Sequence, residues 1–345
     1  MNGRERIACA LRGEWPDRVP VMVHNFMMAA REAGYTMRAF RSDPAALADS
    51  FIRSVEKYGV DGIIVDVDTV TLAGAVGVPV DSPEDEPARA RGGLLAGLED
   101  VAGLPETDIR NYRGVQVWLE GVRLLKRHFG GEICIRGNCD QSPFTLASLI
   151  RGMDGWMMDL LDPEKEESVV ALLEYAASVT MQFIRLMGET GADMTSNGDS
   201  VAGPDLVSPA LFRRFALPYE QRVVGAAHAA GLPYILHICG NTTAILDDMI
   251  ATGADGLEID YKTDFRIAHG KTKDRTAFVG NIDPSGVLAL GTKTVVEEKT
   301  AELLEVFADT PRFILNAGCA LPPTTPPENL QAMIRTARNF ERAIP

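Results

Sequence analysis

Three residues in the second half of the chain carry side chains that bind zinc in proteins. His237 and Cys239 lie two apart in the apolar run Pro233–Gly240 (PYILHICG), and Cys319 ends the run Arg312–Cys319 (RFILNAGC). Residues two apart on a β-strand point to the same side, so His237 and Cys239 can bind the same metal ion. One imidazole and two thiolates leave the fourth tetrahedral position open, as a catalytic zinc site requires. The alternative is that all three are ordinary buried side chains.

The donor set indicates what such a zinc would do. Zn²⁺ bound by two thiolates and a neutral imidazole is formally neutral, and it is a weaker Lewis acid than zinc bound by three histidines. It still binds a thiol and keeps it deprotonated near neutral pH, and the thiolate remains nucleophilic. This chemistry favours alkyl transfer to sulfur over the activation of water.

Polar residues also follow most of the other predicted strands. We expect Asp68, Asp199 and Glu258 to be catalytic groups. Glu258 also qualifies as a fourth zinc ligand in the resting protein, because its strand is next to that of His237. Alternatively, each carboxylate caps the helix that follows it. The residues expected to bind substrate are His24, Asn138, Asp140, Asn197 and Asn281.

Eight short apolar runs alternate with longer amphipathic stretches, a pattern typical of a parallel sheet covered by helices. Eight strand–helix units in 345 residues predict a (β/α)8 TIM barrel, in which catalytic residues gather at the C-terminal ends of the strands. The alternative is an open, doubly wound sheet. The runs are Arg18–Asn25, Gly62–Thr69, Glu132–Asn138, Asp193–Asp199, Pro233–Gly240, Gly256–Asp260, Ala277–Asp283 and Arg312–Cys319.

Between the second and third strands, Asp81–Asp108 is rich in charge, proline and glycine, which predicts a surface insertion. Helices are predicted over Ser168–Glu189, Ser208–Ala230 with a kink at Pro218, Val295–Ala308 and Pro327–Ala343. No domain boundary is visible, so residues 1–345 are expected to form one barrel domain.

The composition excludes several classes of function. A net charge of −14 argues against binding to nucleic acid, which needs clustered Lys and Arg. We expect no membrane association, because no apolar run reaches transmembrane length. The start of the sequence lacks a secretion signal, and the five cysteines form no disulfide framework. A cytoplasmic protein is therefore expected.

Three segments resemble the uroporphyrinogen decarboxylase superfamily: Arg136–Ser148 (RGNCDQSPFTLAS), Gly280–Pro284 (GNIDP) and Ile314–Gly318 (ILNAG), the last followed by Pro322–Asn329 (PPTTPPEN). The resemblance runs over nearly the whole chain, and it implies a (β/α)8 barrel.

The chain departs from the decarboxylases at the positions that handle their substrate. Their Arg-Gln-Ala-Gly-Arg motif after the first strand is replaced by Asn25–Gly34, which lacks the arginine pattern. Their active-site tyrosine falls on Leu149, and their histidine near the last strand falls near Cys319. Asp68 is retained and matches their catalytic aspartate. One match in four argues against porphyrinogen decarboxylation.

The His-x-Cys … Cys pattern of His237, Cys239 and Cys319 is similar to the zinc motif of the corrinoid-dependent methyltransferases in this superfamily. The resemblance implies that zinc activates one substrate while a methyl group moves to or from a corrinoid (methylcobalamin) on a partner protein. The substrate would be a thiol such as coenzyme M, or a methoxy compound undergoing O-demethylation. The rival hypotheses are a tetrapyrrole decarboxylase with altered residues and a non-catalytic zinc- or corrinoid-binding protein.

Overall fold

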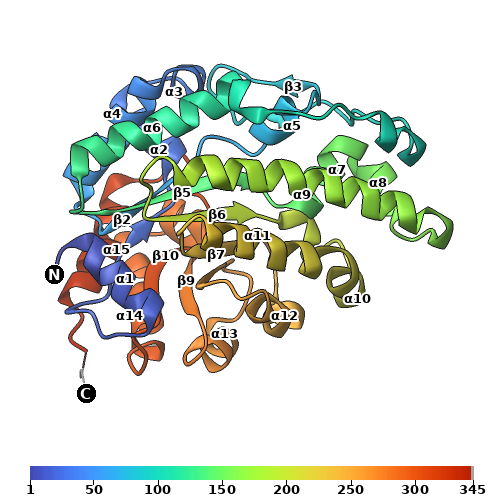
Figure 1. The fold of residues 1–345 in the computed structure, drawn as a ribbon. Helices are drawn as coiled ribbons and strands as arrows, with labels where there is room; N and C mark the ends of the chain where they lie inside the picture. Colours follow the sequence, from blue (N-terminus) through green and yellow to red (C-terminus); the bar gives the residue numbers. More distant parts are fainter. Residues whose placement is uncertain (343–345) are drawn as a thin grey trace.

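The computed structural model describes residues 1–342, which wrap around a barrel of eight parallel strands (Figure 1). Each barrel strand pairs with the next one along the chain, and the ring closes where Val21 bridges Leu315. The predicted (β/α)8 barrel and its eight strands are confirmed, and the open-sheet alternative is wrong. The strands are β1 (Met22–Val23), β2 (Gly62–Val65), β5 (Cys134–Gln141), β6 (Met194–Gly198), β7 (Tyr234–Ile238), β8 (Gly256–Ile259), β9 (Ala277–Ile282) and β10 (Phe313–Ala317).

The first strand is shorter than the predicted Arg18–Asn25. Pro20 has no N–H to donate, although its carbonyl accepts from the Leu315 amide. At the other end, Asn25 already precedes the first turn of the next helix. Only Met22 and Val23 therefore join the ladder with β2.

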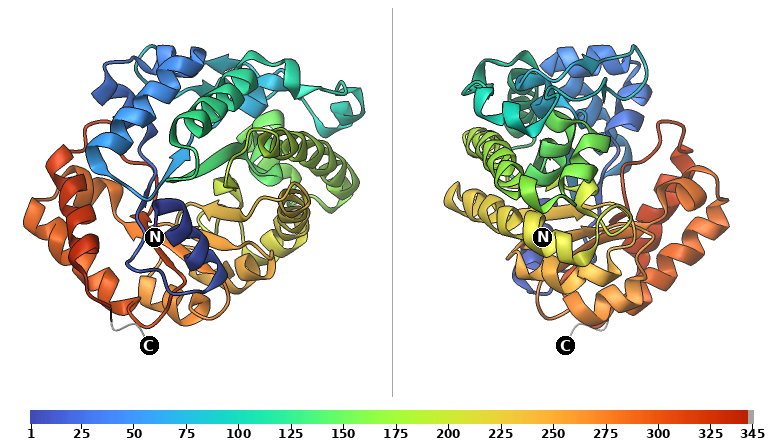
Figure 2. Two further views of the ribbon diagram at one scale, coloured as in Figure 1. Left: turned by 60° about the vertical axis from the view of Figure 1, so that its left-hand side comes forward. Right: turned by 90° about the vertical axis from the view of Figure 1, so that its right-hand side faces the viewer.

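Helices cover the outside of the barrel, as the two further views show (Figure 2). Those between β1 and β5 are α2 (Phe26–Ala33), α3 (Met37–Ser42), α4 (Pro44–Tyr58), α5 (Thr71–Ala75) and α6 (Arg113–Phe129). Those after β5 are α7 (Pro143–Arg151), α8 (Met153–Asp159), α9 (Glu166–Gly188), α10 (Pro209–Leu211), α11 (Leu217–Ala229), α12 (Leu246–Ala251), α13 (Phe265–Thr272), α14 (Lys293–Val306) and α15 (Pro327–Asn339).

The N-terminal helix α1 (Gly3–Arg12) lies across one end of the barrel (Figure 2). Its Ile7 and Ala10 pack in one buried cluster with a residue from nearly every strand, and this apolar layer closes that end of the interior. The open end is therefore the one where the strands finish, which is the functional end of such barrels. The strand residues of the cluster are Met22, Ile64, Cys134, Met194, Ile235, Val279 and Ile314.

The predicted insertion is present between α5 and α6, and it contains a short antiparallel ribbon that the sequence did not predict, β3 (Val80–Asp81) with β4 (Arg89–Ala90). The buried guanidinium of Arg41 donates to the carbonyls of Pro83 and Glu86 and ties the ribbon to α3. Pro87, between the two strands of the ribbon, lines the same cavity as residues at the ends of the barrel strands, so the insertion lies beside the open end of the barrel.

The predicted helix Ser208–Ala230 is divided. Ser208 caps its start, as expected, by accepting from the Leu211 amide. A π-helical turn (Phe212–Ala216) then precedes α11, where Pro218 lacks the N–H that a continuous helix needs. The final helix begins at Pro327, as predicted, and ends at Asn339, whereas the predicted end at Ala343 lies outside the described residues.

One helical segment, Pro163–Gly188, is long and apolar enough to cross a membrane by length and composition, contrary to the expectation that no run has this property. Within its most apolar window, 56% of the residues are buried. In the fold, α9 packs against α6, α11 and β5, so its apolar face is part of the core.

Candidate active site

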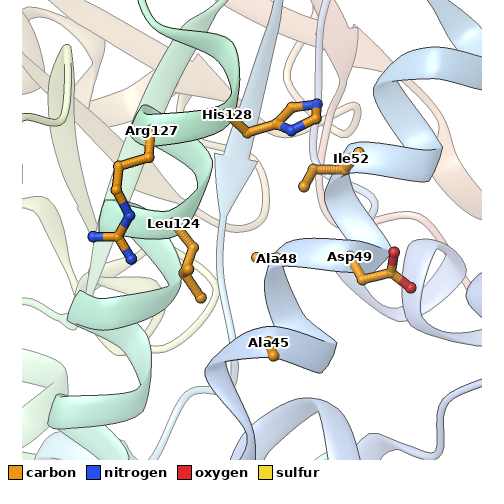
Figure 3. A pocket seen from close by; sticks show the side chains of 7 residues that line it. All are labelled: Ala45, Ala48, Asp49, Ile52, Leu124, Arg127 and His128. Carbon is orange, nitrogen blue, oxygen red and sulfur yellow. The ribbon is translucent and has the colours of Figure 1, made fainter.

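The open end of the barrel contains a cavity of about 240 Å³. It reaches down from the loops to the side chains of the strands, and its lining includes all three predicted zinc ligands. A second hollow, on the outer surface between α4 and α6, is lined by residues such as Ile52, Leu124 and His128 (Figure 3). That hollow contains no cysteine and lies away from the strand ends, so the barrel cavity is the candidate active site.

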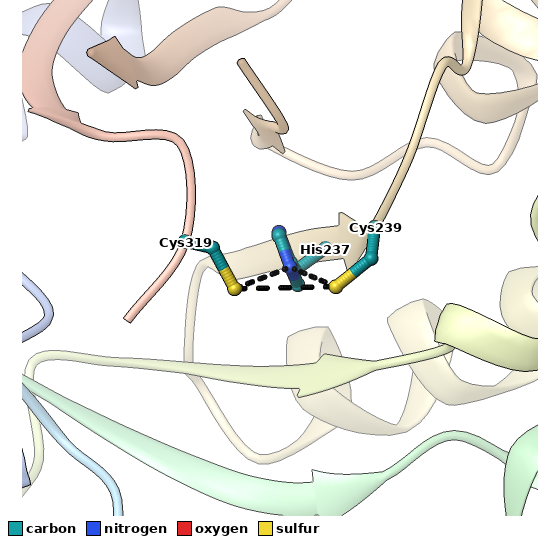
Figure 4. A group of neighbouring side chains, drawn as sticks. All are labelled: His237, Cys239 and Cys319. Atoms are coloured by element: carbon teal, nitrogen blue, oxygen red, sulfur yellow. Dashed lines mark hydrogen bonds between the residues drawn. The ribbon is translucent and has the colours of Figure 1, made fainter. Parts of the chain in front are cut away.

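His237, Cys239 and Cys319 converge on one point of this cavity (Figure 4). His237 Nε2 lies 3.1 Å from Cys239 Sγ and 3.9 Å from Cys319 Sγ, and the two sulfurs are 4.0 Å apart. His237 lies in β7 and Cys239 directly after it, while Cys319 lies two residues beyond β10. Three side chains from two distant segments thus form one cluster.

Two glycines bring the cysteines to this position. Gly240 has a left-handed φ of 89°, which turns the chain sharply after Cys239, and its amide donates to Asp260. A Cβ atom on Gly318 would lie 2.4 Å from the backbone nitrogen of Tyr261. Only glycine therefore allows the segment after β10 to cross the β8 loop and place Cys319 opposite Cys239.

The separations fit a zinc ion. Zinc–nitrogen and zinc–sulfur bonds in a tetrahedral site place two sulfurs roughly 3.8 Å apart and a nitrogen roughly 3.6 Å from each sulfur. The three distances in the structure differ from these by about 0.5 Å or less. In the described part of the chain, no other group of three metal-binding side chains is as close together.

The imidazole of His237 is held in the tautomer that a metal needs. Its Nδ1 lies 3.0 Å from the backbone carbonyl oxygen of Glu258, which can only accept, so Nδ1 carries the proton. Nε2 is the nitrogen that faces the two sulfurs, and it would bind a metal through its lone pair once its own proton is displaced. This outer hydrogen bond fixes both the ring orientation and the donor atom.

The two cysteines differ in acidity in the metal-free protein. A hydrogen bond from Cys319 and the nearby charge of His237 outweigh burial and lower the pKa of Cys239 to about 3. Ser200 also donates to Cys239 Sγ, at 3.1 Å. The same hydrogen bond, together with burial, raises the pKa of Cys319 well above its usual value. Burial lowers the pKa of His237, but the Cys239 thiolate outweighs it and raises this pKa to about 10. One thiolate is therefore ready to bind a cation.

Glu258, the candidate for a fourth ligand, points elsewhere. Its Oε2 lies 2.5 Å from Arg136 Nη2, and its Oε1 accepts from the Asn316 amide at 3.0 Å. Burial raises the pKa of Glu258, but the charge of Arg136 outweighs it and lowers this pKa to about 2. The carboxylate lines the cavity as half of a buried ion pair, outside the cluster of three donors.

A row of hydrogen-bonded polar side chains lines another part of the cavity. His24 Nε2 lies 2.8 Å from Asp66 Oδ2, and Asn138 donates to Asp66 Oδ1 while accepting from Ser196. His24 and Asn138 were predicted as substrate-binding residues, and both line the cavity. Asp66 was not among the predicted site residues, although it follows β2 in the position of an inward-facing residue.

The retained Asp68 does not line the cavity. Its carboxylate accepts from the Val70 amide and the Thr71 hydroxyl and so holds the turn that leads into α5. Asp140 does line it, with a left-handed φ of 58°. Asp140 is fully buried and accepts from the Leu72 amide, while its Oδ1 has no partner, and burial raises its pKa well above the usual range.

The remaining predicted residues divide between the cavity and the framework. Asn197 lines the cavity and donates to the Cys139 carbonyl. Asp199 is buried behind the wall, where it accepts from the Thr145 amide. Asn281 lies outside the cavity and donates to the carbonyls of Asp260 and Thr263. The predicted site residues did not include Arg136, Ser200 or Asp66, and all three line the cavity.

Comparisons with known proteins show which proteins this chain is similar to. The chain is 29% identical to a methylcobamide:CoM methyltransferase of Methanosarcina acetivorans, with 98% of each chain covered. It is 30% identical to a uroporphyrinogen decarboxylase of Nocardioides sp., with 91% of this chain and 89% of the relative covered. A solved methyltransferase from Methanosarcina mazei has the same fold, with a TM-score of 0.90, 25% identity and 99% of each chain covered.

A family model described as uroporphyrinogen decarboxylase (URO-D) matches residues 2–340. The match spans every strand of the barrel and all three residues of the His/Cys cluster. The chain therefore belongs to the uroporphyrinogen decarboxylase family, and its similar relatives include methyltransferases as well as decarboxylases.

Proposed function

We propose that the protein is a zinc-dependent methyltransferase that moves a methyl group between a corrinoid on a partner protein and a small substrate. The substrate is a thiol that accepts the methyl group, as coenzyme M does in the name of the relatives, or a methoxy compound that loses it. The observation that carries the proposal is the convergence of His237 Nε2, Cys239 Sγ and Cys319 Sγ on one point of the cavity.

The residues support this chemistry directly. When bound, zinc would keep a substrate thiol deprotonated and nucleophilic near neutral pH. Two of the proposed metal ligands are held in place by hydrogen bonds. The backbone carbonyl of Glu258 in β8 orients His237, and the Ser200 hydroxyl orients Cys239. The open side of the three donors faces the cavity, where substrate enters. His24, Asp66 and Asn138 line the wall that would orient it.

The size of the cavity supports a reaction in which only the small substrate enters the barrel. About 240 Å³ accommodates a small molecule, whereas pockets for drug-sized ligands run from roughly 300 to 1,000 Å³. A corrin macrocycle is larger than this cavity, so we propose that the corrinoid stays on its own protein and presents its methyl group at the mouth. The small substrate is then the only reactant that the barrel encloses.

The charges of the cavity disfavour the rival decarboxylase. A uroporphyrinogen carries eight carboxylates, and its binding needs cationic partners. The one guanidinium in the lining, Arg136, is already paired with Glu258 through Nη2, and Asp66 would face the substrate's own carboxylates. The second rival, a non-catalytic zinc-binding protein, would need a closed shell of four protein ligands around the metal. Glu258, the candidate for the fourth ligand, is instead engaged by Arg136 and Asn316.

The experiment that tests the proposal measures zinc and methyl transfer together. We expect about one zinc per chain in the parent protein and transfer from methylcobalamin to a thiol, detected as methyl thioether and cob(I)alamin. Cys239→Ala should lose most of both signals. Cys9→Ser is the matched control, because Cys9 lies in α1 at the closed end of the barrel. A parent that cannot be loaded with zinc would remove the proposal.

A further inference from the structure

The sulfur of Cys239 has one contact that metal binding does not require. Ser200 Oγ lies 3.1 Å from Cys239 Sγ, and its hydroxyl donates to the sulfur. The other side-chain groups near this sulfur are His237 Nε2 and Cys319 Sγ, which are themselves proposed metal ligands. Among the side chains that the structure describes, Ser200 is therefore the one hydrogen-bond donor that Cys239 would keep once a cation is bound. A bound cysteine is a thiolate without a proton to give, so the hydroxyl remains the donor.

The residues on both sides of Ser200 hold it in this position. Ser200 follows the end of β6, where the amide of Asp199 donates to the His237 carbonyl oxygen at 2.8 Å. On the other side, the amide of Val201 donates to Thr145 Oγ1 at 3.1 Å. Because both neighbours are tied to other elements of the barrel, the hydroxyl has a defined place on the cavity wall, which Ser200 lines.

The sulfur of Cys319 has no such hydroxyl beside it. In the described part of the chain, the side chains within hydrogen-bonding distance of Cys319 Sγ are those of His237 and Cys239. The further group that acts on it is the backbone amide of Ala320. The two cysteines of the cluster therefore differ in a feature that a substitution can remove, the hydroxyl donor on Cys239.

This difference matters because both cysteine sulfurs line the cavity in which a methyl group would be transferred. Attack by Cys239 Sγ on the methyl carbon would form a sulfur–carbon bond and break the carbon–cobalt bond, leaving the electron pair on cobalt. The thioether produced has lost the negative charge that makes a thiolate a metal ligand. A methyltransferase with this donor set therefore needs its own thiolates to be less reactive than the substrate.

Building on the proposed function, we propose that Ser200 is a positioning residue that reserves the methyl group for the substrate, because its hydroxyl draws negative charge from Cys239 Sγ. Hydrogen bonds around the sulfur of a ligating cysteine tune the properties of a metal site. Those to a charged acceptor are among the strongest in proteins, and a thiolate becomes less nucleophilic as it becomes less basic. Cys239 with the Ser200 hydroxyl in place is thus a weaker competitor than Cys239 without it.

Methyl iodide tests the reactivity of the sulfur directly. It is small enough to enter the cavity, and iodide leaves with the electron pair when the sulfur–carbon bond forms. The zinc-loaded parent and Ser200→Ala are treated side by side, and methylation of each cysteine is followed by peptide mass spectrometry. We expect Cys239 to be methylated about three- to tenfold faster in Ser200→Ala. Methylation of Cys319 in the same samples should be unchanged.

A spectroscopic measurement reports the charge on the sulfur without any reaction. With Co²⁺ in place of zinc, the sulfur-to-metal charge-transfer band should move to longer wavelength in Ser200→Ala, because the sulfur keeps more negative charge. Ser200→Thr retains a hydroxyl and should restore both the band and the methylation rate of the parent. Thr69→Val is the matched control: Thr69 lines the same cavity, but its hydroxyl contacts neither cysteine in the described structure.

The outcomes separate this inference from the proposed function. If Ser200→Ala leaves the band and the methylation of Cys239 as in the parent, the inference is overturned while methyl transfer to a substrate stands. The same holds if Cys319 is accelerated as much as Cys239, because the site would then simply have loosened. If the metal-loaded parent moves no methyl group to a thiol or from a methoxy compound, the proposed function fails, and the role of Ser200 in directing the transfer fails with it.

Discussion

The Nδ1 nitrogen of His237 lies 3.0 Å from the backbone carbonyl oxygen of Glu258, so the backbone of β8 orients the imidazole of the His/Cys cluster. The side chain of Glu258 meanwhile turns to Arg136 inside the barrel. Glu258 therefore contributes to two neighbouring groups of residues: its backbone carbonyl orients the His/Cys cluster, and its carboxylate forms the buried ion pair. The two functions can be separated by mutation.

Glu258→Gln should lower the free energy of unfolding by about 3–5 kcal/mol, because Arg136 is left buried without its counter-charge. Zinc content should stay near one per chain, since the backbone carbonyl remains. The measurements are urea unfolding and metal analysis of the same preparation. The double variant Arg136→Met with Glu258→Leu should recover part of the stability. Loss of zinc from a folded Glu258→Gln protein would instead show that the carboxylate is a ligand.

The two cysteines of the cluster should differ in reactivity in the metal-free protein. The pKa of Cys239 is lowered to about 3 and that of Cys319 is raised, so at pH 6 Cys239 is a thiolate and Cys319 a thiol. Iodoacetamide at pH 6 should therefore modify Cys239 at least about tenfold faster, as measured by peptide mass spectrometry, because the thiolate is the nucleophile. Cys319→Ala should raise the pH at which Cys239 reacts, and zinc should protect both. Equal modification at pH 6 would contradict this assignment.

Asp66 and Asp68 should respond differently to the same change. Asp68→Asn should lower stability by about 1 kcal/mol by weakening its two hydrogen bonds in the turn before α5, with little effect on methyl transfer. Asp66→Asn should change the kinetics, because Asp66 holds His24 and Asn138 in the cavity wall. Steady-state kinetics and thermal unfolding of both variants decide the matter. A large loss of turnover in the Asp68 variant alone would reverse the assignment.

These two aspartates show where sequence reasoning reached its limit. The ends of the strands, and the pairing of His237 with Cys239, follow from alternation and composition, which are local properties of a strand. Alternation ends with the strand, and β2 ends at Val65, so the sequence could not decide which of Asp66 and Asp68 faces the cavity. The resemblance to the decarboxylases pointed to Asp68, whereas Asp66 lines the cavity.

Arg136 was missed for a different reason. A charged residue at the centre of a buried strand has meaning only through its partner, and Glu258 is 122 residues away. Closure of the barrel brings β5 and β8 together across the interior, and no local pattern reports that contact. By contrast, Cys319 could be predicted, because its position after the last strand of a barrel was enough to place it at the same mouth as Cys239.

The last prediction concerns a second pair of acids, Asp199 and Glu220, whose carboxyl groups neighbour each other behind the cavity wall. Both are fully buried; the Thr145 amide donates to Asp199 Oδ1, while Asp199 Oδ2 and the two oxygens of Glu220 have no hydrogen-bond partner of full geometry. A proton shared between the carboxyl groups satisfies them. Burial raises the pKa of both groups, that of Glu220 well above its ordinary value of 4.5.

A carboxyl group whose pKa is higher in the folded than in the unfolded state stabilises the fold while it is protonated. This contribution is fully present at a pH below the pKa of the unfolded state, and it is lost as the pH rises toward the pKa of the folded state. The free energy of unfolding should therefore fall between pH 5 and pH 9. Glu220→Gln stays neutral at every pH and can donate to Asp199, so it should be more stable than the parent by about 1 kcal/mol or more at pH 8, with little difference at pH 5. Urea unfolding of both proteins across this range measures the effect. Parallel stability profiles would mean that no proton is shared by Asp199 and Glu220.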